Sequence, residues 1–140
     1  MKKGLFIASL CLMGSSVNAL AESMISPSPA DAKVYLISPA EGETVTQTFK
    51  VQFGLSGMGV APSGVKRDKT GHHHLLIDSK ALPDLSKPLP STVKHFGGGQ
   101  TETMLTLSPG QHTLQLVLGN FAHIPHDKPL VSNKISITVK

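Results

Sequence analysis

The sequence has little of what small proteins usually use to stabilise a fold or to build a recognisable active site. Its 140 residues include no tryptophan, one tyrosine and one cysteine, and aromatic residues make up 4% of the chain. Because a disulfide needs two cysteines, a hydrophobic core must hold the domain together. The missing tryptophan and cysteine pair also exclude an antibody-type immunoglobulin domain.

Charge is sparse as well. Lysine and arginine number 13 against 9 acidic residues, and they cluster only in the segment Lys66-Arg67-Asp68-Lys69. A nucleic-acid-binding protein would show a basic face or stripe, so we expect no nucleic-acid partner. After the N-terminal segment, no apolar run is long enough to cross a membrane, so we expect no membrane span there.

The first 21 residues have the three parts of a secretory signal peptide. Two lysines begin the segment, an uncharged apolar run follows over residues 4–17, and Ala19 to Ala21 forms a small-x-small cleavage signal. Export to the periplasm is therefore predicted, with cleavage after Ala21 removing Cys11 and lowering the net charge from +4 to +2. Lipid attachment at Cys11 is the less favoured alternative, because Leu10 precedes it instead of a small residue.

The rest of the chain reads as a short tether followed by one β domain. Residues 22–32 are rich in Ser, Pro and Ala, which favours a flexible tether. In residues 33–140, short apolar runs alternate with Gly, Pro, Asn and Asp, and no segment has a helical period. The expected strands are 34–38, 45–55, 72–78, 102–107, 112–118 and 134–139.

This pattern of six short strands predicts an all-β fold, an antiparallel immunoglobulin-like β-sandwich formed by a single domain. The strands at 102–107 and 112–118 are separated by Ser108-Pro109-Gly110, which is typical of a tight turn. We therefore expect these two strands to form a hairpin.

Seven histidines stand out, and all of them follow the predicted signal peptide. On a strand, alternate residues point to the same face, so His72 and His74 share one face and His73 lies on the other. Two imidazoles on one face can bind a single metal ion, and imidazole suits copper, zinc and nickel. The sequence therefore predicts a metal site at this strand.

Further ligands would come from loops. His95 and His123 are the expected partners of the strand pair, with His126 or His73 as substitutes. Asp78 and Glu102 are candidates for carboxylate ligands or for acceptors that orient an imidazole. Two other residues are expected to be structural: His112 follows a turn, and Met58 suits a gap in the core better than a thioether ligand.

The leading hypothesis is an exported, histidine-rich protein of the periplasm that binds copper first and zinc second, and holds the metal or passes it on. The alternative is a non-catalytic interaction module of the cell envelope, with a protein partner there, whose histidines form a structural hydrogen-bond network. A third class, a metal-dependent hydrolase or redox enzyme, would need Glu102 as its base. No catalytic residue is assigned, and an enzyme is the less favoured class.

Three motifs together resemble a bacterial family of small exported proteins known as a domain of unknown function. They are GHHHLLID (Gly71 to Asp78), HFGGGQTE (His95 to Glu102) and SPGQHTLQLVLGNFAHIPH (Ser108 to His126). Some members of that family are labelled as rod-shape-determining proteins. The resemblance implies an exported immunoglobulin-like domain and supplies no function. In chemistry alone, the His-x-His pair is similar to the copper site of copper–zinc superoxide dismutases, although the cysteine pair of those enzymes is missing here.

Overall fold

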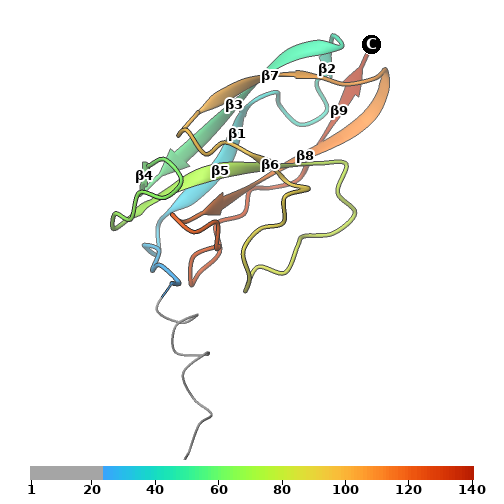
Figure 1. Ribbon diagram of the computed structural model, residues 1–140. Coiled ribbons are helices and arrows are strands. Elements are labelled where there is room, and N and C mark those ends of the chain that lie inside the picture. The colour runs from blue at the N-terminus through green and yellow to red at the C-terminus, as the bar shows by residue number, and fades with distance from the viewer. Residues whose placement is uncertain (1–23) are drawn as a thin grey trace, which may run out of the picture.

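Two β-sheets make up the part of the chain that the computed structural model describes, residues 24–140 (Figure 1). The predicted signal peptide, residues 1–21, lies outside the described residues. One sheet has the order β1 (Lys33–Ser38), β3 (Thr48–Ser56) and β7 (Glu102–Thr106). The other has the order β2 (Thr44–Val45), β9 (Ile135–Val139), β8 (Gly110–Gly119), β5 (Thr70–Ile77) and β4 (Gly59–Val60), with β6 (Lys94–His95) paired to β5.

The prediction of an all-β, immunoglobulin-like β-sandwich is confirmed. The long strands pair antiparallel, whereas the two-residue strands β2 and β4 pair parallel with β9 and β5. Residues 24–140 contain no helix that is long and apolar enough to cross a membrane.

The hydrophobic core lies between the two sheets. Alternate residues of β3, which are Phe49, Val51 and Phe53, are buried there, as the period of two predicts. They belong to one cluster with Leu114, Leu116 and Leu118 of β8, which are fully buried. Burying each such side chain contributes roughly 1.5–3 kcal/mol, so the core can stabilise the domain without a disulfide.

The predicted hairpin is wrong. Strand β7 pairs with β3 in one sheet, and β8 pairs with β5 and β9 in the other, so the turn at 108–110 crosses between sheets. A Pro-Gly turn reverses or redirects the chain without specifying a partner strand. The strand predicted over 45–55 is likewise divided, because Val45 pairs with Val139 of β9 before the chain joins β3 at Thr48.

Residues 24–32, for which a flexible tether is predicted, make specific hydrogen bonds from residue 24 onward. The Ser28 N–H donates to Asp127 Oδ1 at 2.9 Å, and the Asp127 N–H donates to the Ser26 carbonyl at 3.0 Å. The buried Asn120 donates from Nδ2 to the Met24 carbonyl at 2.8 Å. This segment therefore lies against the loop that follows β8.

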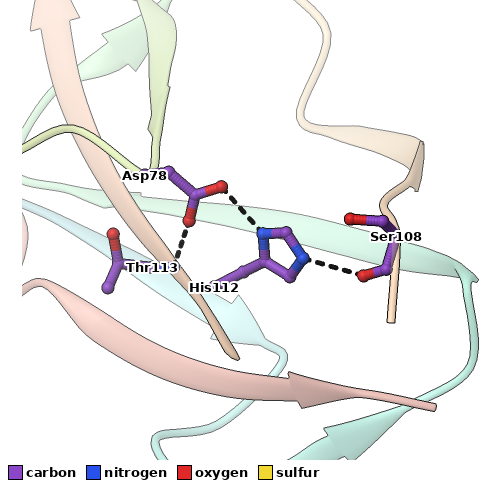
Figure 2. A network of polar contacts seen from close by, with 4 residues as sticks. All are labelled: Asp78, Ser108, His112 and Thr113. Carbon is purple, nitrogen blue, oxygen red and sulfur yellow. Dashed lines mark hydrogen bonds and ion pairs between the residues drawn. The ribbon is translucent and has the colours of Figure 1, made fainter. Parts of the chain in front are cut away.

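A polar network joins the end of β5 to β8 (Figure 2). His112 donates from Nδ1 to Asp78 Oδ2 at 2.7 Å and from Nε2 to the Ser108 carbonyl at 2.8 Å. The other carboxylate oxygen of Asp78 accepts the Thr113 N–H at 2.9 Å. Both ring nitrogens of His112 face acceptors, so the charged imidazolium is favoured, and the hydrogen bond to Asp78 raises the pKa of His112. The expectation that His112 is structural is confirmed.

We predict that Asp78→Asn lowers the pKa of His112 toward its ordinary value of about 6.5. Because the His112 pKa is higher in the folded than in the unfolded chain, the pair stabilises the fold below about pH 6.5, and this contribution is lost as the pH rises through the folded pKa. Asp78 is half exposed, so the contribution is below about 1 kcal/mol. An NMR titration of His112 measures the shift. Asp84→Asn, at an exposed carboxylate, is the control, and an unchanged His112 pKa in Asp78→Asn would contradict the assignment.

Candidate metal centre

The site begins on β5, whose two faces are both buried. His73 points into the core, where its ring lies 5.2 Å from the ring of Phe53. His72 and His74 point to the opposite face of the strand, and their ring centroids are 4.8 Å apart. The predicted division of the triplet between two faces is therefore confirmed, and it leaves His72 and His74 outside the main core but 0% and 2% exposed.

Strand pairing adds the third histidine. His95 of β6 lies directly opposite His74 in the antiparallel register, and residues opposite each other share a face of the sheet. The two rings stack at 5.1 Å, and the His95 ring also lies 4.9 Å from that of His72. A two-residue strand is thus enough to place His95 beside the pair on β5.

The fourth histidine comes from the turn after β8. His123 has φ 64°, a left-handed conformation that non-glycine residues adopt rarely. Asn120 shapes this turn, because its Oδ1 accepts the N–H groups of Ala122 at 2.9 Å and Ile124 at 3.1 Å. The His123 carbonyl accepts the N–H of Leu89, which ties the turn to the long loop after β5. Hydrogen bonds on both sides hold this backbone conformation in place.

The ring nitrogens of these four histidines converge. One ligand atom from each of His72, His74, His95 and His123 lies within 4.8 Å of the others, and the Nε2 atoms of His95 and His123 are 3.1 Å apart. Four nitrogens around a tetrahedral ion, at about 2.0–2.1 Å each, lie roughly 3.3 Å from one another. The spacing of 3.1 Å between His95 and His123 is close to this value, whereas pairs nearer the 4.8 Å limit would have to draw together on binding.

Two glycines beside the cluster provide the space that the imidazole rings fill. A Cβ at Gly119, which is opposite His72 in the β5–β8 register, would lie 2.7 Å from Cε1 of His74. A Cβ at Gly97 would lie 2.3 Å from Cε1 of His95. Both distances are shorter than real side chains allow, so the absence of a side chain at Gly97 and Gly119 is a condition of the cluster.

Electrostatics keep the inner histidines neutral. Burial, followed by repulsion from the neighbouring imidazoles, lowers the pKa of His72 to about 4 and that of His74 to about 3. Burial also lowers the pKa of His95. A neutral imidazole carries the lone pair that a metal ion needs, so His72, His74 and His95 are in the binding-competent form near pH 7.

Buried ring nitrogens of the cluster are unpaired. Within residues 24–140, three ring nitrogens of the cluster have no hydrogen-bond partner: both nitrogens of His72, and Nδ1 of His74. An unpaired buried polar atom costs about 1–3 kcal/mol and is rare in native proteins. These orphaned lone pairs, with no thiolate or carboxylate among the clustered residues, fit a metal ion that prefers nitrogen ligands.

The other candidate ligands lie elsewhere. His73 faces the core, and His126 donates from Nε2 to the Thr70 carbonyl at 3.1 Å. Asp78 is paired with His112, and Glu102 lies on β7 in the other sheet with a salt bridge of 3.2 Å to Lys50. Met58 packs against the core, as expected. Four of the six predicted ligands are brought together, whereas His73, His126 and both carboxylates are not part of the cluster.

Sequence reasoning missed two residues of the site. Ser63 places its Oγ 3.1 Å from Nε2 of His123, and Asn120 builds the turn that carries His123. The Gly-Asn pair at 119–120, after a predicted strand and before two histidines, is a turn signal that could have revealed Asn120. Nothing in the residues around Ser63 distinguishes it from an ordinary loop serine.

The sequence matches the family described as Domain of unknown function (DUF4399) over residues 51–140, and the chain belongs to this family. The match includes all four clustered histidines. It agrees with the resemblance found in the sequence at the level of a family of unknown function. No curated protein matches the sequence.

Two solved structures are similar in fold. The endo-beta-1,4-mannanase from Thermotoga petrophila is 15% identical with a TM-score of 0.46, and the match covers 79% of this chain and 20% of the mannanase. The fibronectin(III)-like modules of Clostridium thermocellum CbhA are 13% identical with a TM-score of 0.37, covering 76% of this chain and 92% of theirs. The chain spans about a fifth of the mannanase, and neither similarity bears on activity.

We predict that His72→Leu makes the metal-free protein less sensitive to acid. In the wild type the unfolded chain takes up a proton at His72 below about pH 6.5, whereas the folded chain does so only near pH 4, so stability falls as the pH falls through this window. The loss from His72 alone is about 2 kcal/mol between pH 7 and pH 5. Urea unfolding in the presence of a chelator, at both pH values, measures it.

The matched control is His112→Leu, because the His112 pKa is raised by Asp78. Its loss should weaken the fold more at pH 5 than at pH 8, the opposite trend to His72→Leu. Equal pH dependence in His72→Leu and the wild type would show that His72 is not held neutral by the fold.

We further predict that Asn120→Ala destabilises the domain by about 1–3 kcal/mol, because two N–H groups of the His123 turn lose their acceptor. Hydrogen exchange should rise at residues 122–124 and also at residues 24–28, since the same side chain donates to Met24 and Ser26. Asn133→Ala, at an exposed asparagine, is the control. Unchanged exchange in both segments would refute the role assigned to Asn120.

Proposed function

We propose that this protein is an exported metal-binding protein that holds copper, or zinc as the second choice, at the four-histidine cluster, and that it stores or passes on the ion. The observation that carries the proposal is the convergence of four ligand nitrogens within 4.8 Å, with buried ring nitrogens that have no other partner among the described residues. The signal-peptide pattern of the first 21 residues supports export to the periplasm.

The donor set supports the choice of metal. Imidazole nitrogen suits copper, zinc, iron and nickel, and for a given set of such ligands divalent copper binds most strongly of the first-row ions. Zinc follows, because a tetrahedral set of four protein ligands is typical of structural zinc sites. A set of four protein nitrogens, two of them on buried residues, favours holding or transferring the ion over hydrolysis, for which Glu102 would be too far removed in the other sheet.

A structural hydrogen-bond network, the competing interpretation of the histidines, describes His112 and His126 and also includes the contacts of His123 with Ser63 and His95, but it does not include the inner pair. His112 bonds to Asp78 and Ser108, and His126 bonds to the Thr70 carbonyl. His72 and His74 lack such partners at their buried nitrogens within residues 24–140, so a network does not account for them. We therefore assign the four clustered histidines to metal binding, and the other three, which are His112, His126 and the core-facing His73, to structure.

The test is a calorimetric titration of the purified protein with Cu(II) and with Zn(II). We expect one saturable site per chain, and electron paramagnetic resonance of the copper form should show several equivalent nitrogen ligands. His74→Ala should weaken binding by more than the roughly 10–100-fold that loss of an outer hydrogen-bond partner costs. The His72→Ala/His74→Ala double variant should lose the site.

His112→Ala is the matched control, because it removes a histidine outside the cluster and should leave the affinity unchanged. Metal should also raise the free energy of unfolding of the wild type, by about 4 kcal/mol at a free metal concentration a thousand times the Kd. Lack of saturable binding at micromolar metal, or equal binding by the double variant, would end the proposal.

A further inference from the structure

The four-histidine cluster is open on one side only. His72 and His74 are buried, whereas His95 is exposed and His123 is half buried. An ion held by these rings would be shielded by β5 and reachable from the side of His95 and His123. This inference rests on the proposed function.

Ser63 stands beside that side of the cluster. Its Oγ is 3.1 Å from Nε2 of His123, the same nitrogen that lies 3.1 Å from Nε2 of His95. The hydroxyl is therefore in contact with a nitrogen of the convergent set and not with the outer edge of a ring. Among the described residues, Ser63 is the one non-histidine side chain that makes a hydrogen bond to a ring nitrogen of the cluster.

The position of Ser63 is fixed by both loops that carry the outer histidines. The Ser63 N–H donates to the Gly97 carbonyl at 2.8 Å, two residues after His95. The next N–H, of Gly64, donates to the Phe121 carbonyl at 2.9 Å, two residues before His123. Main-chain hydrogen bonds of Ser63 and Gly64 thus fix the backbone that carries the hydroxyl, so its position relative to His95 and His123 is defined.

Metal loading changes what the Ser63 hydroxyl can bond to. Once the lone pair of His123 Nε2 is used by the metal, that nitrogen can no longer accept a hydrogen bond from Ser63. The hydroxyl proton then needs another acceptor, and the solvent-facing side of the ion is next to it. A small ligand bound there would supply that acceptor.

The charge of the site favours an anion. Four neutral imidazoles leave the charge of a divalent ion uncompensated, because the clustered residues include no carboxylate or thiolate within the described chain. Asp78, Asp84 and Glu102 are engaged with His112, Lys87 and Lys50. Lys66 adds a positive charge next to the turn that carries His123, because its Nζ lies 5.4 Å from the ring centroid of Phe121.

We propose that the solvent-facing side of the four-histidine centre is a binding position for a small anion, and that the hydroxyl of Ser63 is the positioning group that holds the anion against the metal. The expected ligand is an anion of one to three atoms that can both reach the ion and accept one hydrogen bond. Ser63 contributes to anion affinity and leaves metal affinity to the histidines.

Azide is the probe, because it gives a charge-transfer absorption when it binds Cu(II). We expect a saturable azide band with the copper-loaded wild type. In Ser63→Ala the azide affinity should fall about tenfold or more, the effect of losing one hydrogen bond to a charged group. Copper affinity in the same variant should stay within about threefold. Ser63→Thr, which keeps a hydroxyl, should restore azide binding, and the exposed Ser86→Ala should leave it unchanged.

Each other result overturns the inference in a recognisable way. Copper binding without an azide band in the wild type means that the centre has no open position. Equal azide affinity in Ser63→Ala means that the hydroxyl does not hold the anion, and loss of copper from that variant means that Ser63 only clamps the loops. If the protein binds zinc but not copper, the azide titration is done on the Co(II)-substituted protein, and the same outcomes decide the inference. If no metal binds, the proposed function itself fails.

Discussion

Burial of both faces of β5 is the constraint on which the rest of the site depends. His72, His73 and His74 are 0%, 0% and 2% exposed, although each ring carries two polar nitrogens. One face of the strand seals the core between the sheets, and the other is covered by the loops after β5 and β8. The buried histidines therefore lie in a low-dielectric environment that keeps them neutral and leaves ring nitrogens unpaired.

The site lowers the free energy of unfolding of the metal-free protein, and the apolar core offsets this loss. Unpaired buried nitrogens at His72 and His74 weaken the metal-free fold, whereas the cluster around Val51, Leu114 and Leu116 stabilises it. The left-handed backbone at His123 follows the same pattern, since it is held by Asn120 and by the loop at Leu89. His73 and His126, outside the cluster, also have unpaired ring nitrogens, so the mark of the site is that its unpaired nitrogens converge and that a strained backbone lies beside them.

The face that each member of the histidine triplet occupies was predictable from the sequence, and so was the all-β sandwich. Both depend on the period-two alternation of a strand, which is a local property. The crossing between sheets at 108–110 was not predictable, and a hairpin was wrongly expected there, because a turn sequence does not choose its partner strand. The role of Ser63 was hidden for a similar reason: its contacts to Gly97 and His123 are made across the fold, by residues 34 and 60 positions away in the chain.

By itself, the sequence determined that any metal would have to be held without a cysteine pair, that His72 and His74 would share a face, and that a single hydrophobic core would carry the fold. Only the tertiary structure decided which other histidines join them. His95 enters through the β5–β6 register and His123 through a turn after β8, while His126, three residues further on, bonds to the Thr70 carbonyl. Strand alternation acts over neighbouring residues, whereas the meeting of three separate segments depends on long-range pairing.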